Sequence, residues 1–520
     1  MPRRLLAAMA AILLVAGQAG SALAAATAAK AAAGPAASAP IQKGLLENLA
    51  SGKADAFVVE FSAKADLRGA AKVKGHTARG KFVLDTLTAN ARKSQAAAQL
   101  LANKSGIQAK SYWLYNEMVV QGSAKQAQAF AKLKGVTAVR AMKIYPLVKP
   151  VPSKVVIQQA SGDPEWGVEK IGAPGAWDEG ILGQGVVVAS VDTGVDFTHP
   201  ALVNQYRGNN GDGTFTHDYN WWDGTGTCGG EPCDDVGHGT HTMGTMVGGD
   251  GPGPFTPDVG VAPGARWIAA KGCAPDGCPE DALLSSGQWI LAPTDLNGEN
   301  PDPSLRPDVV NNSWGGGPGD PFYMATVQAW RAAGIIPIFS SGNPGPFCGE
   351  GGSPGDFNEV FSSGATDIND QIADFSGRGP SPFGKVNPDV VAPGVNVTSS
   401  VPGGGYEAFD GTSMAAPHVT GTIALILSGK PALLGDPNNY QATTNAVRVT
   451  AIDHIDTTCG GDADGDPNNV YGDGRIDAKA AADLIATGGT LSGTITDQAT
   501  SARSRAQRSP RATASGRSTR

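Results

Sequence analysis

The chain has 520 residues, 41% of them hydrophobic, and a formal net charge of −8. This length is too great for one ordinary core, and the hydrophobic content excludes a fibrous protein, so at least two globular domains are expected. The charge is unevenly divided, because residues 41–160 carry 19 basic and 6 acidic side chains whereas residues 161–490 carry 12 and 41. The lysines of the basic segment are scattered without an aromatic stacking pattern. We therefore predict no nucleic-acid partner and expect the two segments to attract each other.

The first 24 residues have the pattern of a cleavable export signal. Arg3 and Arg4 precede an apolar run from Leu5 to Ala16, and the segment ends in small residues. This run is too short to cross a bilayer, and no later segment is long enough, so no membrane span is expected after removal of the signal. We predict a secreted, extracellular protein whose signal is followed by an Ala-rich linker over residues 25–51.

Residues 52–150 predict a small α+β domain. A strand, a helix, a β-rich stretch, a second helix and a last strand are expected, in that order, at Ala56–Phe61, Leu84–Lys104, Tyr112–Gly122, from Ser123 to about Gly135, and Val136–Pro146. Residues 151–164, rich in Pro, Lys and small polar residues, predict an exposed connector in which cleavage would fall.

Residues 165–488 predict a larger α/β domain. Short apolar runs such as Val186–Val191 and Ile335–Phe339 alternate with helical segments, which favours a buried parallel sheet flanked by helices. Ligands and chemistry gather at the carboxyl ends of such strands, where Asp192, Asn311 and Asn343 fall. The last segment, residues 489–520, is rich in Arg, Ser and Ala and predicts a disordered basic tail.

All six cysteines lie in the larger domain, and their number and the export signal fit disulfides in an oxidising compartment. Two close pairs are separated by four residues each and can close locally, which leaves one distant pair. The predicted bridges are Cys228–Cys233, Cys273–Cys278 and Cys348–Cys459, although six cysteines allow 15 connectivities. A zinc site is the alternative, but these spacings lack nearby His ligands or a second regular pair.

The most informative motif is Gly411-Thr412-Ser413-Met414-Ala415-Ala416-Pro417-His418. It places a serine hydroxyl at the start of an apolar helix predicted over 414–427, where free backbone amides and the helix dipole favour negative charge. Pro417 lies in the first turn, where a missing amide hydrogen costs least. Ser413 is therefore a candidate nucleophile, and the alternative is a plain N-cap serine.

Two upstream motifs supply partners for this serine. His238, in Gly237-His238-Gly239-Thr240-His241, is a candidate general base, and Asp192, in Ser190-Val191-Asp192-Thr193-Gly194, could orient its imidazole. A metal site at His238 and His241 is the alternative, but the known zinc motif needs a spacing of four and an intervening Glu. Asn343, between Gly342 and Pro344, could direct its amide at a developing oxyanion, with the Ser413 amide, or simply mark a turn.

These motifs, together with Trp166–Gly172 and Asn311–Gly315, resemble those of the subtilisin-like (S8) serine peptidase family over roughly Trp166 to Ala486. The resemblance implies a serine endopeptidase that acts through an acyl-enzyme, with Asp192, His238 and Ser413 as the triad and Asn343 at the oxyanion. It also implies that Ser313, Trp314 and Gly315 form an extended strand that pairs with the substrate backbone. Ser341, where family members commonly have Ala, and Pro344 depart from the pattern and bear on the aim of Asn343.

By the same resemblance, residues 52–150 would be an inhibitor-type, ferredoxin-like prodomain of a zymogen. It would act as intramolecular chaperone and inhibitor of a monomeric enzyme for protein or peptide substrates, and would be removed by self-cleavage. No cofactor is expected for catalysis, and structural calcium is possible. The Asp-rich segment Asp462–Asp466 resembles a calcium loop, but the Gly and Glu of that motif are missing, so a turn is the preferred interpretation.

Two other functions are compatible with parts of the sequence. Gly411–Ala415 nearly matches the nucleophile motif of α/β-hydrolase esterases, with Asp436 and His454 in the required order, although the last Gly of that motif is Ala. A secreted binding protein on an inactive peptidase scaffold is the third possibility. It predicts a damaged triad or oxyanion position, and the sequence has neither.

Overall fold

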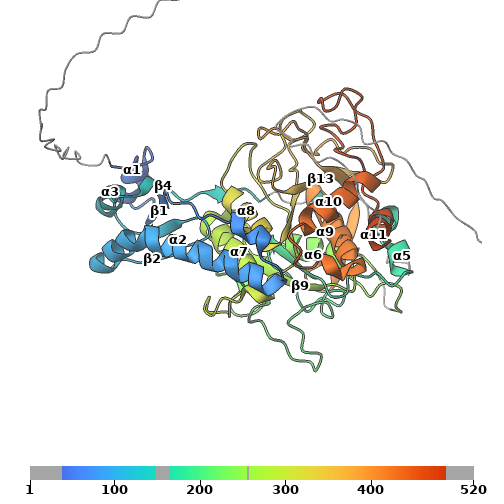
Figure 1. The fold of residues 1–520 in the computed structure, drawn as a ribbon, viewed down its shortest axis with the longest axis horizontal. Coiled ribbons are helices and arrows are strands. Elements are labelled where there is room, and N and C mark those ends of the chain that lie inside the picture. Colours follow the sequence, from blue (N-terminus) through green and yellow to red (C-terminus); the bar gives the residue numbers. More distant parts are fainter. Residues whose placement is uncertain (1–37, 148–150, 153–163, 255–256, 488–520) are drawn as a thin grey trace, which may run out of the picture. The chain divides into compact units, whose positions relative to one another are not determined.

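The computed structural model describes residues 38–147, 151–152, 164–254 and 257–487 (Figure 1). The predicted export signal, most of the connector and the basic tail therefore lie outside the described residues. Within residues 38–147, called the N-terminal subdomain below, four strands form one sheet in the order β2-β3-β1-β4, and all neighbouring pairs are antiparallel. The elements are β1 (Ala56–Phe61), α2 (His76–Ser105), β2 (Ala109–Tyr112), β3 (Glu117–Gln121), α3 (Ala124–Ala131) and β4 (Val136–Arg140). This βαββαβ order confirms the ferredoxin-like prediction.

The subdomain begins earlier in the chain than the sequence pattern indicates. Residues at the end of the predicted linker form α1 (Leu45–Ala50). Leu45 and Leu49 lie one helical turn apart and are buried in the same cluster as Phe57 and Phe130 of the sheet and α3. The alanine-rich composition upstream concealed this short amphipathic turn.

The larger part contains a seven-stranded sheet in the order β14-β13-β12-β11-β7-β9-β8, and every neighbouring pair is parallel. The strands are β7 (Val187–Asp192), β8 (Trp221–Asp223), β9 (Arg266–Lys271), β11 (Val309–Asn312), β12 (Ile336–Ser340), β13 (Phe361–Thr366) and β14 (Val390–Pro393). Their residues are almost all buried, as expected when helices cover both faces of a parallel sheet. The predicted fold class is confirmed.

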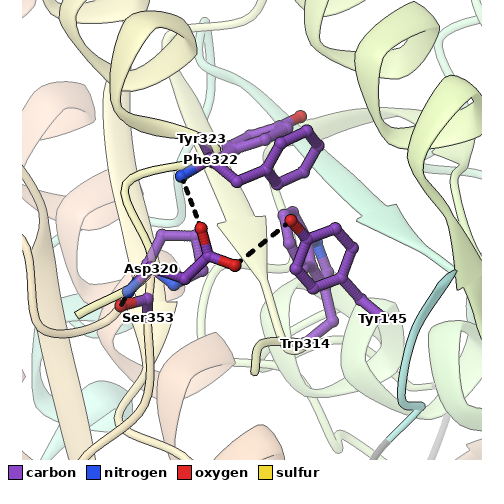
Figure 2. A pocket seen from close by; sticks show the side chains of 7 residues that line it. Tyr145, Trp314, Asp320, Phe322, Tyr323 and Ser353 are labelled. Carbon is purple, nitrogen blue, oxygen red and sulfur yellow. Dashed lines mark hydrogen bonds between the residues drawn. The ribbon is translucent and has the colours of Figure 1, made fainter. Parts of the chain in front are cut away.

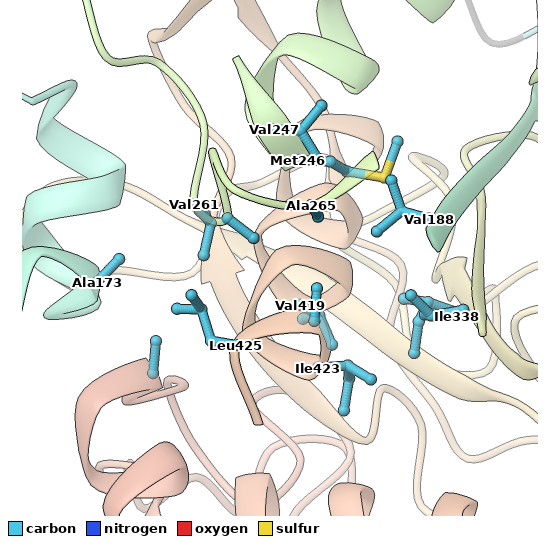
Figure 3. Packing of buried hydrophobic residues seen from close by; sticks show 14 of the residues in the cluster. Ala173, Val188, Met246, Val247, Val261, Ala265, Ile338, Val419, Ile423 and Leu425 are labelled. Atoms are coloured by element: carbon cyan, nitrogen blue, oxygen red, sulfur yellow. The ribbon is translucent and has the colours of Figure 1, made fainter. Parts of the chain in front are cut away.

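Helices pack on both faces of this sheet. On one face α6 (His238–Val247) and α9 (Thr412–Gly429) lie side by side, and Figure 3 shows Val419 and Ile423 of α9 in one buried cluster with Val188 and Ile338 of the sheet. The opposite face is covered by α7 (Glu280–Leu291) and α8 (Met324–Ala333). Val83 and Leu87 of α2 belong to this second cluster. The N-terminal subdomain therefore shares a hydrophobic core with the outer helices of the larger part.

Shorter elements complete the fold. A three-stranded sheet joins β15 (Val397–Val401), β16 (Gly405–Asp410) and β6 (Val151–Pro152), and a two-stranded pair joins β5 (Ile144–Tyr145) to β10 (Cys278–Pro279). The remaining helices are α4 (Trp166–Lys170), α5 (Ala173–Trp177), α10 (Asn439–Thr450) and α11 (Ala478–Ala486), with 3-10 turns at Arg68–Lys72, Pro303–Leu305 and Pro431–Leu433. Over the described ranges, no helix is both long and apolar enough to cross a membrane.

The six cysteines form the three predicted disulfides, Cys228–Cys233, Cys273–Cys278 and Cys348–Cys459. The first two close short loops, and the third joins positions 111 residues apart. The zinc alternative for these residues is thereby excluded.

Candidate active site

Asp192 and His238 meet at the carboxyl edge of the large sheet. Asp192 is the last residue of β7 and His238 the first of α6, and the distance between His238 Nδ1 and Asp192 Oδ1 is 2.7 Å. Both residues are at most 1% exposed. A Cβ on Gly239 would lie 2.1 Å from the Gly194 carbonyl oxygen, so glycine at this position lets the first turn of α6 approach the end of β7.

The hydrogen bonds of this pair define the histidine tautomer. Asp192 Oδ1 also accepts the Thr193 amide hydrogen at 2.7 Å, and Oδ2 accepts the Thr242 hydroxyl at 3.2 Å. Because a carboxylate accepts on all these contacts, Nδ1 carries the donated hydrogen and Nε2 keeps a lone pair. Among the described residues, Nε2 of His238 has no hydrogen-bond partner although it is buried. It is therefore a base with a vacant acceptor position.

The surroundings make His238 more basic. Burial lowers the pKa of His238, but the charge and hydrogen bond of Asp192 and the charge of Asp234 outweigh it. The pKa of His238 therefore lies above its usual value.

Asp234 connects the two elements that carry the pair, and it was not among the residues predicted from the sequence. Its Oδ1 accepts the Thr193 hydroxyl and the Gly237 amide hydrogen, both at 2.8 Å. Its Oδ2 accepts the amide hydrogen and the hydroxyl of Thr240 at 2.8 and 2.7 Å. The carboxylate thus caps the N-terminus of α6 and binds it to the residue after Asp192. An acid four residues before a motif histidine was the available signal.

Ser413 lies in the first turn of α9, behind the N-cap Gly411, so the plain N-cap alternative does not apply. Its hydroxyl donates to the Ser313 carbonyl oxygen at 3.3 Å. The Ser413 hydroxyl donates to Ser313, and His238 Nε2 has no partner among the described residues. No hydrogen bond therefore joins Ser413 to His238 in this conformation. The helices that carry the two residues, α6 and α9, nevertheless pack against each other.

A second contact fixes the backbone of Ser413. The carbonyl of Ser413 would normally accept from the amide four residues later, but Pro417 has no amide hydrogen. The Ser313 hydroxyl donates to this carbonyl at 3.0 Å and satisfies it. Ser313 is fully buried, so its side chain supports the candidate nucleophile.

Asn343 lies in the loop after β12 and is held by the residue before Ser413. Its Oδ1 accepts the amide hydrogen and the hydroxyl of Thr412 at 2.9 and 2.7 Å, which orients its Nδ2. A Cβ on Gly411 would lie 3.3 Å from this Nδ2, so glycine leaves room for the amide.

A cavity of about 300 Å³ opens beside these groups. Thr412, Ser413 and Asn343 line it together with Trp314 and Gly315, whereas His238 does not. Residues 313–315 follow the last residue of β11 and belong to no strand here, so their pairing with a substrate backbone stays a prediction.

The described residues on either side of positions 148–150 pair with segments of the larger part near this site. Before them, Tyr145 pairs with Cys278 in an antiparallel arrangement, and Pro146 lines the cavity that Ser413 also lines. After them, Val151 and Pro152 pair with Asp410 and Phe409 of β16, just upstream of Ser413.

The alternative roles for nearby residues find no support. His241 Nε2 contacts the carbonyl oxygens of Val397 and Glu407, both at 3.1 Å, and burial followed by the neighbouring His238 lowers its pKa to about 3. This histidine is a neutral structural residue. His454 stacks on Tyr471 with ring centroids 4.9 Å apart, and Asp436 accepts from Asn438 in its own turn, so neither is joined to Ser413 by a described contact.

The Asp-rich segment closes on itself. The amide hydrogen of Asp462 is donated to the Pro467 carbonyl, and that of Gly465 to the Asp462 carbonyl, as in a turn. In the part of the chain that the structure covers, no group of three or more His, Cys, Asp or Glu side chains is placed to hold a metal ion.

Comparison with known proteins agrees with this geometry. The model of the subtilase family (Peptidase S8) matches residues 183–516. The chain is 38% identical over 465 residues to bacillopeptidase F of Bacillus subtilis (strain 168), which covers 83% of this chain and 31% of that protein. It is 30% identical over 366 residues to subtilisin E of the same strain, which covers 70% of this chain and 83% of subtilisin E.

The motifs at Asn220–Asp223, Ala265–Lys271 and Gly377–Phe383 predict a similarity to bacillopeptidase F, and the comparison confirms it. The chain spans only about a third of that relative's length. Family model, sheet topology and relatives agree: the chain belongs to the subtilase family of serine peptidases.

Proposed function

We propose that this protein is a secreted serine endopeptidase that hydrolyses protein or peptide substrates through an acyl-enzyme, with Asp192, His238 and Ser413 as its triad. The observation that carries the proposal is the buried pair of His238 and Asp192. His238 Nε2 has no partner among the described residues, and His238 begins α6, the helix that packs against the helix bearing Ser413. The three disulfides favour an oxidising, extracellular location.

The chemistry follows from the donors and acceptors. Rotation of the Ser413 hydroxyl away from the Ser313 carbonyl would direct it to His238 Nε2, which takes its proton while Oγ attacks the substrate carbonyl carbon. The negative oxygen of the tetrahedral intermediate accepts from Asn343 Nδ2 and from the Ser413 amide, which has no intrahelical acceptor in the first turn of α9. The His238 imidazolium, stabilised by Asp192, then protonates the leaving amine. Water releases the acyl group by the reverse sequence.

We further propose that residues 52–150 form the prodomain of a zymogen and act on the folding and inhibition of the same chain. The pairing of β5 with β10 and the position of Pro146, which lines the same cavity as Ser413, support this role. Self-cleavage in the connector, residues 151–164, would then release a monomeric enzyme. Structural calcium stays a prediction from the family resemblance.

The test compares the parent with Ser413→Ala, each expressed as the full chain, by electrophoresis and intact mass. The parent should shorten without added protease, and Ser413→Ala should keep its full length after loss of the signal. Equal maturation of the two would refute self-processing. His238→Ala should be inactive while His454→Ala is active on peptides, and the reverse pattern would favour the esterase assignment.

A further inference from the structure

We infer that the candidate active site prefers substrates with a tyrosine two residues after a basic residue, on the N-terminal side of the bond it cleaves, and that Asp320 recognises both side chains. The inference rests on the proposed function, because it treats residues 143–147 as a bound, substrate-like segment.

Tyr145 lines a small pocket beside the cavity that Ser413 lines, together with Trp314, Phe322 and Asp320 (Figure 2). The Tyr145 side chain is only 8% exposed and stacks on Phe322 with ring centroids 4.6 Å apart. Trp314, which lines both the pocket and the cavity, connects the two. Because the next residue, Pro146, already lines the cavity, the pocket receives a side chain N-terminal to the reacting bond.

Asp320 is the acidic residue at this aromatic pocket, and its position is fixed by its own loop. Its Oδ1 accepts the Phe322 amide hydrogen at 3.1 Å, and its backbone amide donates to Ser353 Oγ at 3.0 Å. The Ser353 hydroxyl in turn donates to Asp356 Oδ2 at 2.9 Å. The loop therefore holds the carboxylate before any ligand arrives.

The other oxygen of Asp320 contacts the N-terminal segment. Oδ2 accepts the Tyr145 hydroxyl at 3.4 Å and lies 3.0 Å from Lys143 Nζ. Burial, and then the charge of Asp320, raise the pKa of Tyr145, so the phenol stays a donor. Oδ1 of Asp320 is thus bonded within its own loop, and Oδ2 contacts the side chains of the N-terminal segment.

The Asp320 carboxylate allows the site to distinguish tyrosine from phenylalanine, which an aromatic pocket alone would not do. Phenylalanine would fill the same space but leave Oδ2 of Asp320 without the phenol donor. Lys143 is half exposed, so its ion pair with Asp320 contributes little, about fivefold in affinity at most, and weakens with salt. We expect each change to lower kcat/KM about three- to fivefold, chiefly through KM.

The test uses the purified mature enzyme and quenched peptides with the sequence of residues 141–152, with cleavage sites identified by mass. Three peptides carry the native sequence, Phe in place of Tyr145, or Met in place of Lys143. The enzymes are the parent, Asp320→Asn and, as a matched control, Asp295→Asn, whose carboxylate accepts from the amides of its own turn. An unrelated peptide without Lys or Tyr reports the folding and activity of each variant.

The parent and Asp295→Asn should prefer the native peptide over both substituted ones, and Asp320→Asn should lose the preference for Lys. Asp295→Asn should cleave the unrelated peptide at the parental rate. Equal cleavage of the three peptides by the parent, or an unchanged preference in Asp320→Asn, would overturn the inference. If the parent cleaves no peptide at all, the proposed function fails instead.

Discussion

Asp234 provides the sharpest test of how the fold supports the candidate base. Its carboxylate accepts hydrogen bonds from Thr193, Gly237 and Thr240, and also from the Val236 amide at 3.1 Å. These bonds hold the start of α6 against the end of β7. In Asp234→Asn one oxygen becomes an amide group, which cannot accept the donors on its side. The negative charge near His238 is also lost.

The expected magnitude follows from these contacts. If the amide replaces Oδ2, the Thr240 amide hydrogen loses its acceptor while the Thr240 hydroxyl can rotate, so one hydrogen bond to a charged group is lost at a cost of about 2 kcal/mol. The charge of Asp234 raises the pKa of His238, so its removal should lower that pKa. His238 must be neutral to accept a proton. The acidic limb of the pH profile should therefore move to lower pH.

The assay is kcat/KM against pH for a small peptide, together with urea unfolding in a Ser413→Ala background that prevents self-digestion. Asp212→Asn, which removes an acid from an exposed turn that it closes with Thr214, is the charge-matched control. A lower unfolding free energy with an unmoved acidic limb would mean that Asp234 only caps the helix. A limb that moves equally in Asp212→Asn would refute the local electrostatic argument.

Three further predictions concern residues around the site and the disulfides. Ser313→Ala should lower the unfolding free energy by about 1–3 kcal/mol in urea, because the buried Ser413 carbonyl loses its donor, whereas Ser286→Ala, whose buried hydroxyl has no partner among the described residues, should be near neutral. Asn343→Ala should lower kcat far more than it changes KM in steady-state peptide assays; the expected loss of about 10²–10³-fold is the value known for the corresponding donor of subtilisin, a relative of this chain, and is carried over from it. An unchanged kcat would remove Asn343 from the oxyanion position. Replacing Cys348 and Cys459 by Ala should cost about 5 kcal/mol in urea against about 2 kcal/mol for Cys228 and Cys233, because loop entropy grows with separations of 111 and 5 residues, and equal costs would contradict that account.

The features that could be predicted are those encoded locally. Buried apolar runs such as the one ending at Asp192 identify parallel strands, and the glycine-rich loops around His238 and Ser413 carry their order within short stretches. Two disulfides join cysteines only five positions apart in the sequence. Once these pairs are made, Cys459 is the one cysteine that remains to pair with Cys348.

The features that escaped prediction depend on contacts distant in sequence. The Ser313 hydroxyl reaches a carbonyl 100 residues away, and its sequence neighbours indicate only a strand end. Asp320 lies 175 residues from Tyr145, in a loop with no motif. Such pairings are set by how the elements pack, so a single sequence shows the residue types but not which of them meet.

In the described part of the chain, the opposite charges of the two segments meet at few points. These close contacts act differently from the overall attraction between the segments. Glu280, whose side chain is fully buried at the start of α7, lies 2.7 Å from Arg140 and accepts the Lys143 amide hydrogen at 2.8 Å. Burial raises the pKa of Glu117 to about 8 despite its contact with Arg140, so Glu117 is mostly protonated at neutral pH. The ion pairs of Arg140 are then mainly those with Glu280 and Glu60. Scattered exposed lysines act through a field that salt screens, whereas a pair this buried is screened much less. The excess charge therefore favours encounter of the two parts, while the buried Arg140–Glu280 contact fixes where they bind.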